Sequence, residues 1–457
     1  MKIYNTLTRK KEEFKPITKQ KASIYSCGPT VYHYPHLGNH RAYIFMDILN
    51  KTLLQNGFEV NLVMNITDVG HLTDDGDQGE DKMEKGSKRE GKTAWEIADY
   101  YTQKFMEDIK SLNIKTPSII CKATDHIKEQ IEMVKKIEEN GYTYITKDGV
   151  YFDTSKLKEY GELIQGFNPE NLEAGKRVGM GEKKNPTDFA LWKFSGKEKR
   201  QMEWESPWGK GFPGWHIECT AMGCKYLGDQ FDIHTGGIDH ITVHHTNELA
   251  QARACTGKKH ANYWMHSAHL LENKEKMSKS KGEFLRIKNL KQKGFDALDY
   301  RYFCLLTSYR KELNFTWQAL EAAKTARENL IKKISTLQKK EVETINTKKY
   351  LDEFKEAIND DLNTPVAIAI IRKALNDQKL SSTEKYTIAK KSDEVLSLNL
   401  FETKEIKVPE EITMLAKKRL EAKKQKNFDL ADKLREEIRE KGFEIKDKKD
   451  GFEITKI

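Results

Sequence analysis

The sequence contains little cysteine and no long apolar run. Six of its 457 residues are cysteine, too few for the disulfide framework of a small secreted protein, so reduced thiols are expected. No apolar stretch approaches the roughly 18 residues that a membrane-spanning helix needs. The basic residues near the N-terminus are not followed by the apolar segment of a signal peptide. These absences predict a cytoplasmic protein that has no membrane partner.

Familiar metal-binding motifs are missing as well. The chain has no C-x-x-C pair and no H-E-x-x-H, which excludes zinc fingers and zincins. Residues 209–214 match G-x-G-x-x-G, but Ser206-Pro207-Trp208 stands where a strand should precede the motif, and Pro213 lies inside it. We interpret this match as coincidental and expect no dinucleotide site there.

The composition is that of a globular protein with a slight excess of positive charge. Hydrophobic residues make up 37% and aromatic residues 10% of the chain, enough for real cores, which excludes wholesale disorder. Lys and Arg number 79 against 70 Asp and Glu. This excess suits an enzyme with a local basic face that meets a polyanion better than a protein that wraps nucleic acid along its length.

Two strand–helix–strand patterns stand far apart in the chain. A long insertion between two such halves is typical of a nucleotide-binding parallel sheet that the insertion splits. The first pattern is a strand over 23–26, a helix over 41–55 and a strand over 60–66; the second is a strand over 231–234, a helix over 244–255 and a strand over 262–271. The fold class predicted is therefore α/β with a Rossmann-like sheet.

The rest of the chain divides by its local patterns. A helix over 127–137 and a hairpin over 142–152 occupy the insertion, a glycine-free stretch predicts an all-α bundle, and two helices with two strands form an α+β tail. We predict six segments, which are the first half of the sheet domain (1–115), the connective insertion (116–205), the second half (206–275), a loop region (276–315), the bundle (316–405) and the tail (406–457).

Two short motifs suggest triphosphate chemistry. His36-Leu37-Gly38-Asn39 lies at a predicted strand-to-helix junction, where free backbone N–H groups bind phosphate. Lys276-Met277-Ser278-Lys279-Ser280 follows the second half of the sheet, and its two lysines can neutralise charge as pyrophosphate leaves. Alone, the first motif is equally an ordinary capped helix, and the second is a solvated lysine loop. Found together, in this order and on the two halves of a split sheet, the two motifs indicate triphosphate chemistry far more specifically than either motif alone.

With these two motifs the chain resembles the class I aminoacyl-tRNA synthetases, whose signatures are HIGH and KMSKS. KMSKS is matched in full, while HLGN departs at its second and fourth positions. Further motifs make the chain similar to the cysteinyl-tRNA synthetase family over nearly its whole length. They are Cys27-Gly28-Pro29-Thr30-Val31-Tyr32, Asn185-Pro186-Thr187-Asp188-Phe189, Pro213-Gly214-Trp215-His216-Ile217-Glu218-Cys219, Gly236-Gly237-Ile238-Asp239, His244-His245-Thr246-Asn247-Glu248, Tyr263-Trp264-Met265-His266-Ser267 and Asp361-Leu362-Asn363-Thr364-Pro365.

The resemblance places a zinc ion on Cys27, Cys219, His244 and Glu248. Two thiolates, an imidazole and a carboxylate are acceptable ligands for Zn²⁺, and the last two residues share a helical face because they are four positions apart. Without the resemblance, cysteines this far apart are better explained as buried structural thiols. The neighbours Cys224 and His245 are not included in the predicted site, which holds one Zn²⁺ per chain.

The resemblance also implies roles for residues around the zinc. Thr67 and Trp215 are expected to contact the substrate cysteine, although Trp215 is also compatible with a core position. Residues 69–92 receive no role. The expected ATP-binding residues are His36, Gly38, Asn39, Gly237, Asp239 and Lys279, and the expected catalytic residues are His36, Asn39, Lys276 and Lys279, with Mg²⁺ carried by ATP.

The implied activity is attachment of L-cysteine to the 3′ end of tRNA(Cys) by a monomer that consumes ATP. Segment 316–405 is then a tRNA-binding bundle, and 406–457 is an anticodon-recognition domain. The run 417–426 holds six basic residues against one acidic, which suits an RNA backbone contact as well as a solvated helix face. Two alternatives are weighed, a cysteine-activating ligase that uses an amino-sugar acceptor and a non-catalytic tRNA-binding relative.

Overall fold

The computed structural model describes residues 1–71, 81–164, 182–196, 200–272, 275–276, 284–402, 409–448 and 451–456. It divides into two compact units, Met1–Phe401 and Glu402–Ile457. No helix within these ranges is both long and apolar enough to span a membrane.

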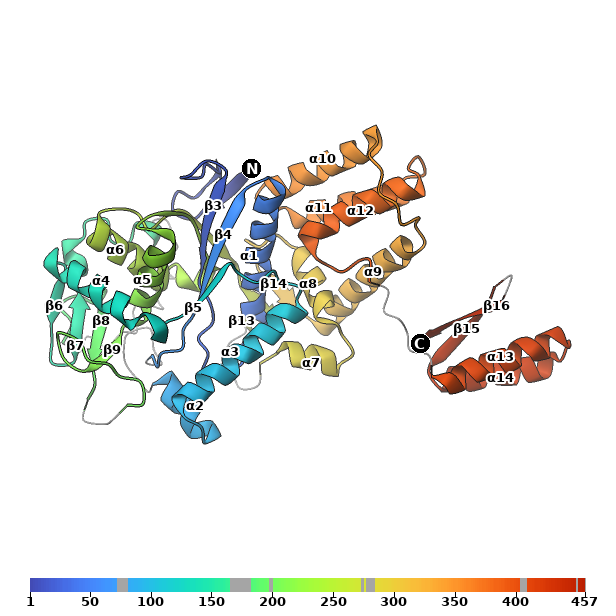
Figure 1. Ribbon diagram of the computed structural model, residues 1–457, viewed down its shortest axis with the longest axis horizontal. Coiled ribbons are helices and arrows are strands. Elements are labelled where there is room, and N and C mark those ends of the chain that lie inside the picture. Colours follow the sequence, from blue (N-terminus) through green and yellow to red (C-terminus); the bar gives the residue numbers. More distant parts are fainter. Residues whose placement is uncertain are drawn as a thin grey trace. The chain divides into compact units, whose positions relative to one another are not determined.

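A five-stranded parallel sheet lies at the centre of the first unit (Figure 1). Its strand order is β11-β10-β3-β4-β5, so strands from both ends of the split domain pair side by side. The α/β class and the split sheet are therefore confirmed. The strands span Ala261–Ser267 (β11), Phe231–Gly237 (β10), Lys21–Ser26 (β3), Glu59–Ile66 (β4) and Ile119–Lys122 (β5).

Helices cover both faces of this sheet, because the strands carry apolar side chains on each face. Ile24 and its neighbours on one face pack in the same core as helix α1, Leu37–Gln55. Tyr25 and the other face pack against α5, Trp215–Leu227, and α6, His244–Thr256. Helix α1 begins four residues earlier than the range 41–55 predicted from the sequence, since His36 caps it.

The insertion forms a separate antiparallel sheet of order β6-β7-β8-β9 beside helix α4, Ile127–Glu139. The four strands span Thr143–Ile145, Gly149–Phe152, Phe189–Phe194 and Gly211–Pro213. The G-x-G-x-x-G match thus contains an edge strand, β9, and no phosphate loop. One boundary needs correction, because β5 lies inside the stretch 116–205 assigned to the insertion yet pairs with β4 in the central sheet.

Several elements carry too little periodicity to be predicted from the sequence. Among them, β2 is made only of lysine and glutamate. The strand predicted over 262–271 is divided into β11 and β12 (Leu270–Glu272), because the chain leaves the central sheet after Ser267. Besides β5, β8 and β9, the unpredicted elements of the described chain are β1 (Lys2–Asn5), β2 (Lys10–Glu13), α2 (Lys82–Glu90), α3 (Ala94–Ser111), β13 (Glu275–Lys276), α7 (Ile287–Gln292), α8 (Ala297–Leu305) and β14 (Leu313–Phe315).

The helical bundle consists of α9 (Trp317–Ser335), α10 (Ile345–Asn359), α11 (Thr364–Asn376) and α12 (Ser382–Leu396), as the sequence predicted. Asp361 joins it to the rest of the first unit, because its carboxylate accepts hydrogen bonds from Tyr4 N at 2.8 Å, Tyr309 Oη at 2.8 Å and Arg310 Nε at 2.7 Å. This motif residue therefore fastens the bundle to the part of the first unit that precedes it.

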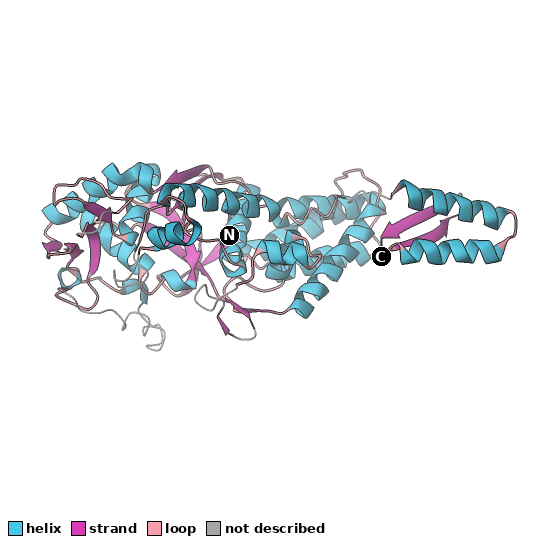
Figure 2. Cartoon of the chain, turned by 90° about the horizontal axis from the view of Figure 1, so that it is seen from below, coloured by secondary structure: helices cyan, strands magenta, loops and turns pink. Residues whose placement is uncertain are grey.

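The second unit packs two helices, α13 (Glu410–Lys424) and α14 (Phe428–Glu440), against a hairpin of β15 (Phe443–Lys448) and β16 (Gly451–Lys456) (Figure 2). Its small core contains Ile412, Ala416, Ile438, Phe443 and Ile445. The α+β character predicted for the tail is confirmed.

Glu384 offers a test of how the bundle helices are held at their ends. Its carboxylate accepts from Ser381 N at 2.8 Å, which caps α12, and from Thr344 Oγ1 at 2.6 Å, which caps α10. The Thr344 hydrogen bond, with those from Ser381, lowers the pKa of Glu384 from 4.5 to about 2. A carboxylate with a lowered folded-state pKa stabilises the fold above its unfolded-state pKa, and this contribution is lost as the pH falls.

We expect Glu384→Gln to lower the free energy of unfolding by about 1 kcal/mol at neutral pH. The difference from wild type should shrink as the pH falls from 4.5 towards 2, because the wild-type carboxyl is then protonated. Urea unfolding followed by circular dichroism measures it, with Glu394→Gln on the exposed face of α12 as the control. A difference that persists undiminished at low pH contradicts the assignment.

Candidate active site

The candidate active site is a cavity at the carboxyl ends of the parallel strands. Its wall includes Ser26–Thr30 after β3, Thr235–Gly237 at the end of β10 and Ser267–Leu270 after β11. Strands β3 and β10 are neighbours from which the chain proceeds in opposite directions across the sheet, towards β4 and towards β11. In open α/β sheets this reversal point is where ligands bind.

The HLGN motif forms the first turn of α1 at this cavity. His36 is the N-cap, its Nδ1 accepts from Asn39 N at 3.1 Å, and Asn39 Oδ1 accepts in return from His36 N at 3.1 Å. A Cβ on Gly38 would lie 3.0 Å from two ring atoms of His36, so glycine is what allows the imidazole to stay there. The three predicted phosphate-binding residues therefore all line the cavity.

Little of the KMSKS motif is described. Residues 277–283, which include Lys279, lie outside the described part of the chain, and only the backbone of Lys276 is described. That backbone pairs with Leu271 in the β12–β13 hairpin. Beyond the motif, Leu285 O accepts from Leu37 N at 2.9 Å. The chain that follows the motif therefore contacts the first turn of α1.

The two glycines at the end of β10 have different roles. A Cβ on Gly236 would lie 2.6 Å from His240 Nδ1 and 2.7 Å from His245 Cε1, so this glycine is required by packing. A Cβ on Gly237 would meet nothing within 4 Å and would point into open space. Asp239 lines the cavity next to it, with its Oδ2 3.5 Å from His269 Nδ1. This edge leaves room for a ligand to approach the backbone.

Thr67 and Trp215 both line the cavity as well. Thr67 Oγ1 donates to Glu218 Oε2 at 3.0 Å, and Glu218 Oε1 lies 2.5 Å from His71 Nε2. Trp215 is half-buried, with its ring centroid 4.4 Å from that of His244. Its position in the cavity wall favours the substrate-contact interpretation over a core position.

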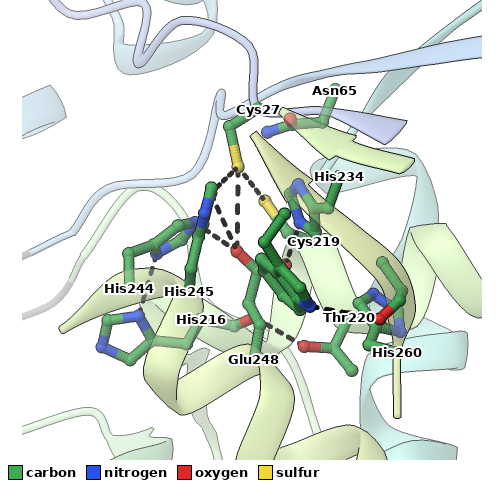
Figure 3. A network of polar contacts seen from close by, with 12 residues as sticks. Cys27, Asn65, His216, Cys219, Thr220, His234, His244, His245, Glu248 and His260 are labelled. Carbon is green, nitrogen blue, oxygen red and sulfur yellow. Dashed lines mark hydrogen bonds and ion pairs between the residues drawn. The ribbon is translucent and has the colours of Figure 1, made fainter. Parts of the chain in front are cut away.

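Cys27, Cys219, His244 and Glu248 converge at this cavity, from the end of β3, from α5 and from α6 (Figure 3), and the first three of them line it. One ligand atom from each lies within 4.8 Å of the others, and all four residues are buried. The two Sγ atoms are 3.9 Å apart, and Glu248 Oε1 lies 3.0 Å from His244 Nε2. The geometry is compatible with a metal site, as the four residues were predicted to form.

Burial disfavours every charged form in this cluster. It raises the pKa of the Cys27 thiol and of the Glu248 carboxyl well above their ordinary values, and it raises the pKa of Cys219. Burial also lowers the pKa of His244 well below its usual range. A divalent cation would reverse the balance for the thiols and the carboxyl, because metal ligands bind in their deprotonated forms.

Comparison with known proteins identifies the family. The family model described as the class I (C) tRNA synthetase catalytic domain matches residues 13–325. The cysteine–tRNA ligase of Treponema denticola is 45% identical over 481 residues, and the match covers 98% of each chain. Cysteine–tRNA ligase 1 of Burkholderia lata is 47% identical and covers 98% of this chain and 95% of its own. This chain belongs to the cysteine–tRNA ligase family.

Solved structures support the same fold at lower sequence identity. Mycobacterium tuberculosis methionyl-tRNA synthetase in complex with methionyl-adenylate superposes with a TM-score of 0.55 at 13% identity, covering 83% of this chain and 90% of that one. A ternary complex of LeuRS, tRNA and LeuAMS from Agrobacterium radiobacter gives 0.56 at 11% identity, covering 84% of each. This chain therefore has the class I synthetase fold.

Sequence reasoning missed the residues that surround the cluster. His234 Nε2 lies 2.8 Å from Glu248 Oε2, and His216 Nδ1 lies 2.9 Å from His244 Nδ1. His245, left out of the prediction, lies with its Nε2 3.3 Å from Cys27 Sγ. His216 and His245 belong to motifs quoted for the ligase family, so a signal existed, but no spacing rule separates a ligand from its supporting partner.

The cluster predicts that the purified ligase carries a bound metal ion. Cys219→Ser removes one thiolate, so we expect this variant to lose the stoichiometric metal that wild type retains after dialysis. Elemental analysis of both proteins measures it. Cys255→Ser is the control, since Cys255 is another buried cysteine, outside the described donor clusters. Equal metal content in wild type and Cys219→Ser would mean that the cluster is not the metal site.

Proposed function

We propose that this chain joins L-cysteine to tRNA(Cys) in two steps. The cysteine carboxylate attacks the α-phosphate of ATP to give cysteinyl-adenylate and pyrophosphate, and the terminal ribose hydroxyl of the tRNA then attacks the carbonyl and releases AMP. The observation that carries the proposal is one cavity that brings the capped His36 turn next to the Cys27–Cys219–His244–Glu248 cluster. Family membership makes the chain an aminoacyl-tRNA ligase.

The donor set and spacing of the cluster fit Zn²⁺. Two sulfurs on one tetrahedral zinc at about 2.3 Å each lie about 3.8 Å apart, and the two Sγ atoms here are 3.9 Å apart. When bound, Zn²⁺ supplies a soft Lewis acid that favours the thiolate of cysteine over the hydroxyl of serine, so no editing domain is needed. This is the zinc that the family resemblance implies.

A second donor set shares Cys27 and Glu248 but uses His234 and His245. We favour the set with Cys219 and His244, because the His244 nitrogen and the Glu248 oxygen that would not bind the metal both have polar partners. His216 lies in hydrogen-bond reach of His244 Nδ1, and His234 holds the far oxygen of Glu248. Ligating imidazoles and carboxylates are normally oriented in this way. In the second set, His234 Nδ1 is buried without a hydrogen-bond partner.

The chain's own residues contribute positioning and charge stabilisation, and no enzyme nucleophile is needed. His36 and Asn39 hold the phosphates at the start of α1, with Lys276 and Lys279 balancing the charge of the leaving pyrophosphate and Mg²⁺ accompanying ATP. Gly38 and Gly237 leave space for the nucleotide, and Asp239 binds the ribose. Thr67 and Trp215 contact the bound cysteine.

The later segments are assigned to tRNA. The bundle over 316–405 contacts the tRNA body, the tail over 406–457 reads the anticodon, and the basic run 417–426 approaches the RNA backbone. The segment over 276–315 contacts the acceptor stem. We infer a monomer that acts in the cytoplasm, where tRNA is charged.

Transfer of labelled cysteine to tRNA by the purified protein, ATP and Mg²⁺ tests the proposal. The product should be base-labile and should disappear when the RNA is digested. ATP–pyrophosphate exchange that depends on cysteine without charging of tRNA would instead support a ligase with an amino-sugar acceptor. Failure of both reactions would support a tRNA-binding relative without catalysis.

Metal removal tests the zinc part separately. We expect protein stripped of metal by a chelator to lose its preference for cysteine over serine in ATP–pyrophosphate exchange, and readdition of Zn²⁺ to restore a preference of about 10⁴-fold or more. The untreated enzyme and enzyme dialysed without chelator are the controls. If metal-free protein still prefers cysteine by orders of magnitude, selection does not depend on zinc.

A further inference from the structure

Lys82 places a fixed positive charge in the cavity wall. It is the first residue of helix α2, and among the described residues that line the cavity it is the only lysine or arginine. Its Nζ lies 5.2 Å from the centroid of the Trp215 ring, within the range of a cation–π contact. This helix comes from the stretch 69–92, to which the sequence assigned no role.

The backbone around Lys82 is held firmly on both sides. Asp81 caps α2 by accepting from Met83 N at 2.7 Å and Glu84 N at 3.0 Å, and its other oxygen forms an ion pair with Arg200. Lys82 N donates to His71 O at 2.8 Å. The Arg200 guanidinium in turn stacks on Phe212, 3.5 Å from the ring centroid. These contacts fasten the start of α2 to the insertion sheet, so the lysine stem has a defined origin.

Trp215 links Lys82 to the metal cluster. The same ring lies 4.4 Å from the ring of His244 and 5.2 Å from Lys82 Nζ. Cysteine is short, with only two carbons between its sulfur and its carboxylate carbon. A cysteine whose sulfur faces the cluster along the Trp215 ring has its carboxylate within the same cavity, where Lys82 is the only lysine or arginine among the described lining residues.

The proposed reaction also favours a cation near the substrate carboxylate. The carboxylate of cysteine must approach the α-phosphate of ATP, and two anions repel one another most strongly in a partly desolvated cavity. Among the described lining residues, the only carboxylate is that of Asp239, whose Oδ2 lies 3.5 Å from His269 Nδ1. A single ammonium on the amino-acid side could both hold the substrate carboxylate and reduce this repulsion.

We propose that Lys82 binds the carboxylate of the substrate cysteine and fixes its orientation along the Trp215 ring. This inference rests on the proposed function, since it assumes that cysteine occupies the cavity with its sulfur towards Cys27 and Cys219. It adds a third anchor to the thiol site and to Thr67. It also gives helix α2 a role in substrate selection.

The test compares ligands with and without the carboxylate. Equilibrium binding of L-cysteine and of cysteamine, which lacks the carboxylate, is measured on the metal-containing full-length protein in the absence of ATP. We expect Lys82→Met to weaken L-cysteine binding about 10- to 100-fold, as for a lost charge-assisted hydrogen bond, and to leave cysteamine binding unchanged. Lys85→Met, which removes an exposed charge from the same helix, should alter neither.

Other outcomes overturn the inference. If Lys82→Met weakens both ligands equally, the lysine only supports Trp215. If cysteine binding is unchanged and the KM for ATP rises, Lys82 holds phosphate instead. Wild type provides a measurement that needs no variant, because equal affinity for L-cysteine and L-cysteinamide would mean that no cation holds the carboxylate. If any of these results is obtained and the wild-type protein still charges tRNA, the proposed function stands and only the role of Lys82 is wrong.

Discussion

The parallel pairing of β3 with β10 is the constraint on which the rest of the site depends. Residues about 200 positions apart come into register there, with Ile24 opposite Ile233 and Ser26 opposite Thr235. Asp232 secures the pair, since its carboxylate accepts from Ser23 N at 2.8 Å and Ser23 Oγ at 2.6 Å. Cys27 follows directly after this register, so the buried donor cluster and the cavity wall at Gly236 and Gly237 are both placed by one pair of strands.

The buried cluster also needs polar partners or a counter-charge for its ionisable groups. Two thiols, a carboxyl and several imidazoles are packed out of water, where ionised forms are costly. Hydrogen bonds within the group satisfy part of this need, as between His245 Nδ1 and His266 Nε2 at 2.7 Å. A divalent cation would satisfy more of it, because it favours the deprotonated ligands. The polar interior is therefore suited to hold such a cation, on which the proposed selection of cysteine depends.

Arg41 connects this centre to the later parts of the chain. Its buried guanidinium donates to Ala268 O at 2.9 Å and His269 O at 2.5 Å, and also to the carbonyls of Ser308 and Lys311. The first turn of α1, the cavity edge after β11 and the segment before the bundle are held together by one side chain. The same contacts accompany the division of the strand predicted over 262–271, since the carbonyls of residues 268 and 269 face the guanidinium.

The sequence by itself determined the fold class, the split sheet, the bundle and the tail, and its family motifs singled out four residues that the structure brings into one buried donor cluster. It could do so because apolar periodicity and motif spacing are local properties, and the family motifs are distinctive. It could not reveal that β5 completes the central sheet, that His234 and His216 support the ligands, or that Lys82 enters the cavity. Those facts depend on contacts between distant segments, such as Asp81 with Arg200, and only the tertiary structure decides which of many lysines and histidines faces a cavity.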